Sequence, residues 1–301
     1  MLTAHAPANG LALDSVNLTG LMELTAGRPE VVVGLIDGSV AATHADLATK
    51  SIRILSQTSH RTPDHASGVG LAHGTFVAGI LAARRGTAAP AICPGCTLLV
   101  QPLLLQAPVA NDAPSASPEN LAEAIINCVD VGARILNLSL SLAPQSPNRE
   151  PKLAQALDHA AAHGTLVVAA AGNQGTVGGS AITRHPWVIP VVACSLAGRP
   201  LPLTNLGSSI ARHGLMAPGD AVTSLGANGK PFMAGGTSAA TPFVTGTLAL
   251  LLSVFPKADA AQVKSATTRA ALRRSTIVPP MLDAWSSYQS ILKRHRSWSD
   301  A

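Results

Sequence analysis

The chain has 301 residues, of which 47% are hydrophobic and only 12% are charged. This composition supports a large buried core, and no Pro-, Ser- and Gly-rich linker divides the chain, so we expect one domain over residues 1–301. The net charge is +5, with basic residues gathered at 293–296 and no aromatic residues interleaved among them. We therefore expect a solvated basic segment at the C-terminus and no nucleic-acid partner.

The first ten residues lack the apolar stretch of a signal peptide, and four cysteines are too few for a disulfide framework. We expect a soluble, cytoplasmic protein with no membrane partner. The uncharged run 235–256 is long enough to raise the question of a membrane span, but its first half is Gly, Thr, Ser and Pro, which favours a buried core helix. Cys93-Pro-Gly-Cys96 is interpreted as a tight turn with two thiols whose redox state stays open. The oligomeric state stays open as well.

Apolar runs typical of buried strands alternate with helical patterns along the chain. Residues 1–15 are expected to be irregular. In order, we expect a helix at 20–26, strands at 30–36 and 51–55, a helix at 73–84, a strand at 97–105, a helix at 118–131, a strand at 133–140, a helix at 151–163, strands at 165–171 and 187–194, short strands and turns at 200–234, and helices at 238–255, 259–271 and 282–294. This alternation predicts an α/β protein, a three-layer αβα sandwich with a mostly parallel sheet.

Four chemically distinct side chains stand at the ends of these elements. Asp37 ends the strand at 31–36, Asn173 follows the strand at 166–170, His73 is expected to start its helix, and Ser238 opens the helix after Gly235-Gly236-Thr237. Sites in such sheets form at the carboxyl ends of the strands, so these side chains are expected to meet.

Together the four side chains have the functional groups that acyl transfer needs. A serine needs a base to take its proton, and a histidine is suited to this because its pKa lies near neutrality. Asp37 would hold the imidazole of His73, and Asn173 would donate its amide N–H to the oxyanion beside the backbone N–H of Ser238. We expect no metal ion and no cofactor.

The motifs resemble those of the subtilisin-like serine peptidases, in the order Asp, His, Asn, Ser. His73-Gly-Thr-Phe-Val-Ala-Gly and Gly236-Thr-Ser-Ala-Ala-Thr-Pro carry most of the resemblance. It covers about residues 20–272, the expected core, and leaves 273–301 as a helical, basic C-terminal segment. The order of the triad is the one known for subtilisin itself.

The resemblance implies a site for an extended peptide. Residues 135–140 resemble the strand that pairs with substrate, and backbone pairing of this kind gives affinity with little side-chain selectivity. The residues implied to contact substrate are Ser139, Leu140 and Ser141 on one wall, Ala170, Ala171 and Gly172 on the opposite wall, and Leu103 and Leu104 in a second flanking segment.

Several departures from the family pattern are visible. Ser141 stands where many members have glycine, and Phe76 replaces a second histidine. The loop 84–90 lacks the Asn and Asp oxygens of the family's tight calcium site, so we expect no calcium there. Asp37-Gly-Ser-Val, the missing signal and pro-region and the lost calcium loop together resemble the intracellular peptidases that mature cyanobactin-type ribosomal peptides by cutting a leader from its core.

Two other serine-site interpretations stay open: a general intracellular degradative peptidase, and a catalytically silent domain that only binds peptides. A nucleotide-binding α/β protein is suggested by residues 31–38 and by Gly68-Val-Gly70, but no Walker lysine is present.

Overall fold

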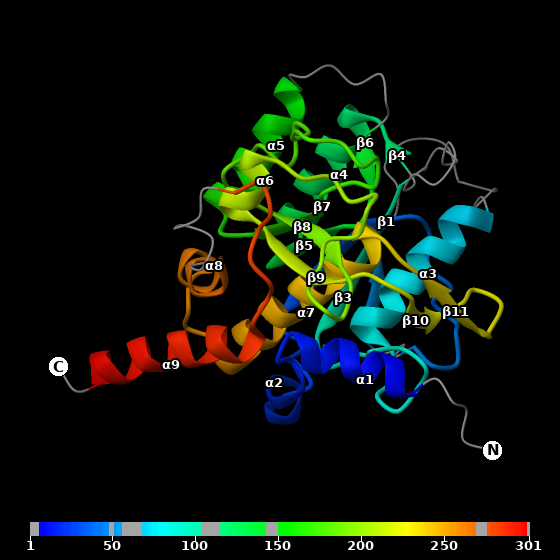
Figure 1. Cartoon of the computed structure of the whole chain (residues 1–301), viewed down its shortest axis with the longest axis horizontal. Helices are drawn as coiled ribbons and strands as arrows, with labels where there is room; N and C mark the ends of the chain where they lie inside the picture. Colours follow the sequence, from blue (N-terminus) through cyan, green and yellow to red (C-terminus); the bar gives the residue numbers. More distant parts are fainter. Residues whose placement is uncertain are drawn as a thin grey trace.

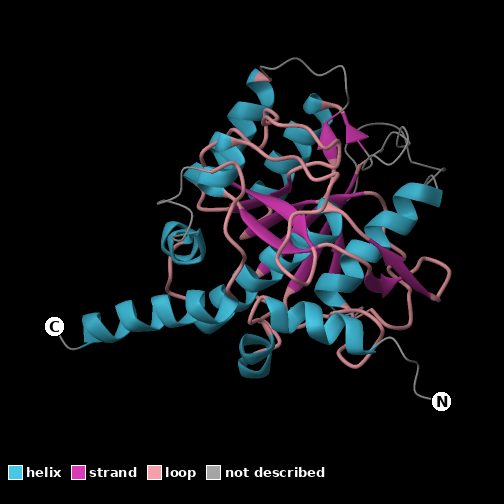
Figure 2. Ribbon diagram, in the orientation of Figure 1, coloured by secondary structure: helices cyan, strands magenta, loops and turns pink. Residues whose placement is uncertain are grey.

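A computed structural model describes residues 6–47, 51–55, 68–103, 115–142, 150–268 and 276–299. Its centre is a sheet of seven strands in the order β2-β3-β1-β5-β7-β8-β9, with helices on both faces (Figures 1 and 2). The strands are β1 (Val32–Asp37), β2 (Ile52–Ile54), β3 (Thr97–Pro102), β5 (Ile135–Leu138), β7 (Leu166–Ala170), β8 (Val188–Cys194) and β9 (Leu215–Pro218).

Neighbouring strands of this sheet run parallel, with Leu35 of β1 opposite Val100 of β3 and Asn137 of β5. Successive side chains of a strand point to opposite faces. Leu35 accordingly packs into the hydrophobic core on one face and Ile36 into the core on the other. This two-sided burial explains why the strands are continuous apolar runs in the sequence.

The long helices divide between the two faces. The core that contains Leu35 is shared with α3 (Gly68–Ala82) and α7 (Thr237–Val254), whereas the core that contains Ile36 is shared with α4 (Pro118–Asp130) and α5 (Pro151–Ala162). The remaining elements are α1 (Ala6–Ser15), α2 (Thr19–Leu24), β4 (Ser115–Ala116), β6 (Ser141–Leu142), α6 (Ser208–His213), β10 (Val222–Leu225), β11 (Pro231–Ala234), α8 (Ala260–Thr268) and α9 (Ala284–Ser299). The predicted three-layer sandwich is confirmed.

Helix α7 is long and apolar enough to cross a membrane, but nearly all of it is buried inside the protein. It packs on β5, β7, β8 and β9 and against α3. It is thus the central helix of one core layer, as the Gly-, Thr- and Ser-rich start of the run indicated.

The expectation of an irregular N-terminus is wrong for residues 6–15, which form α1. The reason is tertiary: the Asn9 side-chain amide donates to the carbonyls of Ala88 (2.7 Å) and Thr223 (2.9 Å) and accepts from the Thr223 N–H (3.3 Å). Ala12 is buried in the core beside them. Such long-range bonds leave no periodic signal in the sequence. The short helix α6 was also missed, within a region expected to hold only strands and turns.

All four cysteines are free and buried. Cys93 and Cys96 form the predicted turn, in which the Cys96 N–H donates to the Cys93 carbonyl at 3.0 Å. Neither thiol is exposed, since both side chains lie in the core under α7.

Candidate active site

Asp37 is the last residue of β1 and is fully buried. Its Oδ1 accepts hydrogen bonds from Nδ1 of His73 at 2.7 Å and from the N–H of Gly38 at 2.6 Å. The carboxylate is thus held at the carboxyl edge of the sheet, where β1 lies between β3 and β5. The strand order reverses at β1, and such a switch point is where sites form in parallel sheets.

Helix α3 brings His73 to this carboxylate. A Cβ on Gly38 would lie 2.2 Å from the Gly70 carbonyl oxygen, and one on Gly74 would lie 2.4 Å from the Ser39 carbonyl oxygen. Only glycine at 38 and 74 permits the loop after β1 to lie this close to α3. This close approach places Asp37 and His73 within hydrogen-bond distance of each other.

The helix begins at Gly68, so the expectation that His73 starts it is wrong: His73 lies in its second turn. The two glycines at 68 and 70 favour a loop by propensity. Packing of this segment on the loop at Gly38 overrides that preference. His73 is therefore fixed by a formed turn on its N-terminal side instead of standing at a fraying end.

The environment of His73 raises the pKa of its imidazole above the ordinary 6.5. Burial lowers this pKa, but the negative charge of Asp37 and the hydrogen bond to it together outweigh burial. The ring is thereby a stronger base than a free imidazole. Its second nitrogen, Nε2, is buried and has no hydrogen-bond partner among the described residues.

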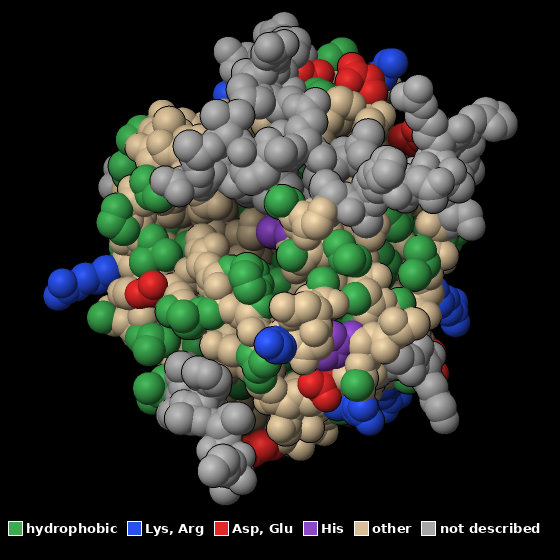
Figure 3. All heavy atoms as spheres, turned by 90° about the vertical axis from the view of Figure 1, so that its right-hand side faces the viewer, with side chains coloured by type: hydrophobic (Ala, Val, Ile, Leu, Met, Phe, Trp, Pro, Cys, Tyr) green, Lys and Arg blue, Asp and Glu red, His purple; other side chains and the backbone are tan. Residues whose placement is uncertain are grey.

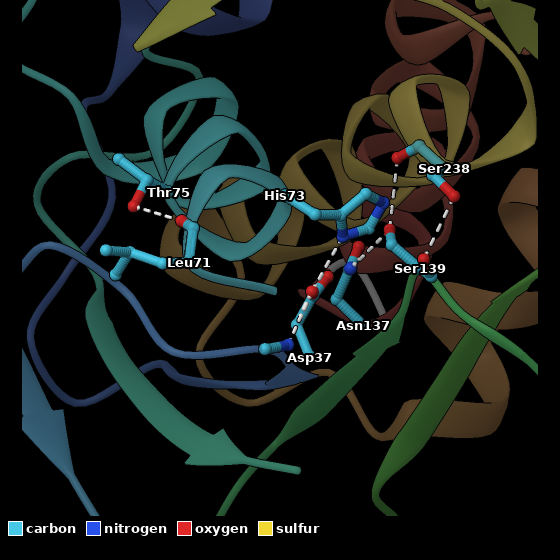
Figure 4. Close-up of polar contacts among 8 residues, drawn as sticks. Asp37, Leu71, His73, Thr75, Asn137, Ser139 and Ser238 are labelled. Carbon is cyan, nitrogen blue, oxygen red and sulfur yellow. Dashed lines mark hydrogen bonds and ion pairs between the residues drawn. The ribbon is translucent and has the colours of Figure 1, made fainter. Parts of the chain in front are cut away.

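Ser238 is the second residue of α7, and the His73 ring lies between it and Asp37 (Figure 4). The Ser238 hydroxyl donates to the Ser139 carbonyl at 2.9 Å. It makes this bond instead of one to Nε2 of His73, a choice of rotamer that the sequence does not predict. The residue before the helix, Gly236, has a φ of +91°, which favours glycine at this sharp entry to the helix.

Asn173 follows β7 and lies against Gly236, where an added Cβ would stand 2.9 Å from its Oδ1. Oδ1 accepts hydrogen bonds from the backbone N–H of Thr237 at 2.9 Å and from the Thr237 hydroxyl at 3.1 Å. A backbone N–H can only donate, which fixes which side of the amide is oxygen. The amide N–H₂ of Asn173 therefore lies on the side of the amide that these two bonds leave free.

The residues implied to contact substrate on one wall follow β5 directly. Ser139 and Leu140 are buried, and Ser141 opens β6, which pairs in parallel with β4 at Ser115. One backbone edge of β6 is therefore already paired with β4. The Ser139 backbone carbonyl lies at the Ser238 hydroxyl, from which it accepts a hydrogen bond.

On the opposite wall, Ala170 ends β7, while Ala171 and Gly172 form the buried turn that leads to Asn173. Gly172 has a φ of +105°, and its N–H donates to the Thr237 hydroxyl at 3.3 Å. Leu103 is half-buried beside Asp37, since its N–H donates to the Asp37 carbonyl at 2.7 Å. Leu104 lies outside the described residues.

Several residues that hold the site were not singled out from the sequence. The Thr237 hydroxyl joins Gly172 to Asn173, and the Asn205 side chain accepts from the N–H groups of Gln174 and Thr176. Asn137 and Thr245 are buried and bonded to each other. Polar residues in otherwise apolar buried segments were the available signal for the last two.

Within the described part of the chain, no group of three or more His, Cys, Asp or Glu residues could hold a metal ion. The loop where the family has its tight calcium site carries guanidinium cations instead. Arg85 donates to the carbonyls of Met22 (2.6 Å), Thr25 (2.8 Å) and Ile92 (3.2 Å), and Arg84 donates to that of Ala45. The Arg85 contacts thus join the loop to α2 and the residue after it and to the segment at residue 92, and the Arg84 contact joins it to the segment at residue 45.

Residues 28–289 match the model of the subtilase family, Peptidase_S8. The chain is 31% identical to subtilisin DY of Bacillus licheniformis over 240 residues, which cover 78% of this chain and 81% of that protein. Its fold matches the structure of the prenylagaramide maturation protease PagA with a TM-score of 0.79 and 26% identity, covering 91% of this chain and 98% of that one.

A mutant of the protease domain of PatA matches with a TM-score of 0.78 and 27% identity, covering 89% of this chain and 97% of that one. The sequence match, the family model and the fold thus point in the same direction as the arrangement of Asp37, His73 and Ser238 in space. The chain therefore belongs to the subtilase family and is a serine endopeptidase.

Proposed function

We propose that this peptidase cuts a precursor peptide bound in an extended conformation, with Ser238 as nucleophile, His73 as general base and Asp37 as the group that orients the base. The observation that carries the proposal is the buried 2.7 Å contact between Asp37 and His73 beside the first turn of α7. The contact raises the pKa of the imidazole and commits Nδ1, so Nε2 is the nitrogen free to accept a proton.

The first chemical step requires the Ser238 hydroxyl to leave the Ser139 carbonyl and turn to Nε2 of His73. An extended substrate that pairs with the segment after β5 would offer its own N–H to that carbonyl. The Ser238 oxygen then attacks the scissile carbonyl while its proton passes to Nε2, and the same proton passes on to the leaving amine. Water, activated in turn by His73, releases the acyl product.

The negative charge that develops on the carbonyl oxygen needs donors that are already in place. Asn173 meets this requirement because Thr237 holds its Oδ1 and leaves its N–H₂ as donor. The backbone N–H of Ser238, in the first turn of α7, is the second donor we assign, since first-turn N–H groups have no partner within the helix.

The substrate class follows from relatives and from the surface. PagA is described as a maturation protease. Uncharged side chains make up most of the centre of the face that carries α3 and β11 (Figure 3), and Val69, Phe232 and Met233 are exposed apolar residues of these elements. A peptide bound mainly through its backbone and apolar contacts would suit this face. The proposal includes a cytoplasmic location, which the four free thiols support.

The test is cleavage-site mapping by mass spectrometry on a panel of leader–core precursor peptides, with scrambled peptides and an unfolded protein as competitors. We expect cleavage at one junction of a precursor and none by Ser238→Ala. Broad cleavage after many residue types would instead indicate a degradative enzyme. Binding of the peptides with no turnover by the wild-type chain would indicate a silent peptide-binding domain.

A further inference from the structure

A chain of buried hydrogen bonds links the middle of α7 to its first turn through the strand β5. The Thr245 hydroxyl donates to Oδ1 of Asn137 at 2.8 Å, and Nδ2 of Asn137 donates to the Ser139 hydroxyl at 2.8 Å. The Ser139 hydroxyl donates in turn to the Ser238 carbonyl at 3.1 Å. Figure 4 shows the Asn137–Ser139–Ser238 part of this chain beside the His73 ring, from Asn137 below the ring to Ser238 at its upper right.

The last link has a local cause in the sequence. In an α-helix the Ser238 carbonyl would accept from the N–H of residue 242, but that residue is Pro242, which has no N–H. A buried carbonyl without a partner is costly, so the position demands a donor from outside the helix. The Ser139 hydroxyl is that donor.

The chain also needs its other members. Thr245, Asn137 and Ser139 are fully buried, so water cannot replace a missing bond. The Ser139 hydroxyl has one proton, and the bond from Asn137 fixes its direction toward Ser238 by occupying the acceptor side. Asn137 in turn is held by Thr245. Removing the Thr245 hydroxyl therefore weakens the constraint on the hydrogen bond between Ser139 and Ser238.

Ser139 contacts Ser238 twice, since its carbonyl accepts from the Ser238 hydroxyl while its own hydroxyl donates to the Ser238 carbonyl. We propose that Asn137 and Thr245 are positioning residues that fix where the nucleophile, Ser238, lies relative to the substrate-pairing segment after β5. Neither touches the reacting atoms. They act through Ser139 and, with Pro242, define the position of the first turn of α7.

This inference rests on the proposed function and predicts a particular kinetic signature. The substrate-pairing segment continues β5, whose backbone is paired with β1 and β7 independently of the chain of side chains. The affinity for substrate should therefore persist when the chain of hydrogen bonds from Thr245 to Ser238 is interrupted. The alignment of nucleophile and scissile carbonyl should not, because small displacements of a reacting group reduce the rate steeply.

The experiment compares two isosteric changes in one helix. Thr247 is also buried in α7, but its hydroxyl bonds only the Phe243 carbonyl within the helix at 2.8 Å. We expect Thr245→Val to lower kcat about 5- to 20-fold with KM changed less than about twofold, while Thr247→Val keeps wild-type kcat. Rates are normalised to sites labelled by a fluorophosphonate, so that only folded enzyme is counted, and Tm is measured for both variants.

Thr245→Ser keeps the hydroxyl and should recover most of the lost kcat. In an Asn137→Leu background, which already lacks the chain, Thr245→Val should have no further effect on kcat. Equal kcat values for Thr245→Val and Thr247→Val, or a loss that Thr245→Ser does not recover, would overturn the inference while the proposed function stands. A wild-type chain that neither labels nor cleaves would instead remove the proposed function itself.

Discussion

Two aspartate–histidine pairs in this molecule have almost the same length but very different surroundings. Asp37 and His73 are 2.7 Å apart, with side-chain exposures of 0% and 16%, whereas Asp130 and His159 are 2.8 Å apart, with exposures of 56% and 32%. Both pairs join an oxygen of aspartate to a ring nitrogen. Geometry alone therefore does not distinguish a catalytic pair from a surface contact.

The difference lies in burial and in what the second ring nitrogen faces. His73 uses Nδ1 for the carboxylate, which leaves Nε2 toward Ser238. His159 uses Nε2 for Asp130, and its ring lies against the His163 ring with the centroids 4.2 Å apart and the planes tilted by 46°. An exposed pair is screened by water and contributes little, while a buried pair alters the pKa of the base. The following predictions test this contrast.

The largest effect is expected when each histidine is removed. His73→Ala should lower kcat by about 10⁶-fold, the size known for subtilisin itself when its catalytic histidine is removed, because His73 is the base of the proposed mechanism. His159→Ala should leave kcat within about twofold of the wild-type value. Steady-state kinetics on one peptide decides the matter, and similar losses in both variants would show that the contrast is wrong.

The carboxylates should differ by a smaller factor. Asp37→Asn should lower kcat about 10⁴-fold, because the amide no longer fixes the tautomer or stabilises the imidazolium. Asp130→Asn should leave kcat unchanged.

The pH profile of kcat/KM tests the direction in which Asp37 shifts the pKa of His73. The base must be neutral to act, so the wild-type profile should rise with pH through a pKa above 6.5. In Asp37→Asn the acid limb should move to lower pH, since the charge that raised the pKa of His73 is gone. An unmoved limb would show that another group controls it.

Removal of the oxyanion amide should have the next largest effect. Asn173→Ala should lower kcat by about 10²–10³-fold with little change in KM, the range known for loss of one such donor from subtilisin itself. Asn120→Ala, the same change at an exposed residue of α4, is the matched control and should stay near the wild-type rate. A tenfold rise in KM at unchanged kcat would place Asn173 in ground-state binding instead.

The smallest effect is on stability. Because the folded-state pKa of His73 is raised, the folded protein binds more protons than the unfolded chain above pH 6.5, so this pair stabilises fully below that pH and its contribution is lost as pH rises through the raised pKa. The free energy of unfolding of wild type minus that of His73→Gln should therefore fall between pH 6 and pH 8. Urea titrations of the two proteins at each pH measure this difference.

Much of the fold was predictable because burial on both sheet faces leaves continuous apolar runs, as at residues 31–36 and 166–170. Asp37, Asn173 and Ser238 were predictable because each stands at or next to the end of an element with glycine nearby, whereas His73, in the second turn of α3, was predictable from the motif around it. Their meeting at the carboxyl edge follows from parallel strand topology. The roles assigned to them remain part of the proposed function.

The rest depends on contacts between distant segments. Helix α1 is held by Asn9 on Thr223 and Ala88, and the early start of α3 depends on the loop at Gly38. The partner of the Ser238 hydroxyl is a rotamer choice between two acceptors on different elements. The link from Thr245 to Asn137 joins residues 108 positions apart. None of these leaves a local pattern.

The most direct test of the account is the rate at which a fluorophosphonate labels the wild-type chain, followed from pH 5 to pH 9 with peptide mapping of the product. The account predicts one labelled residue, Ser238, and a rate that rises with pH through a pKa above 6.5, the raised pKa of His73. Labelling at another residue, or a rate at Ser238 that does not depend on pH, would contradict it.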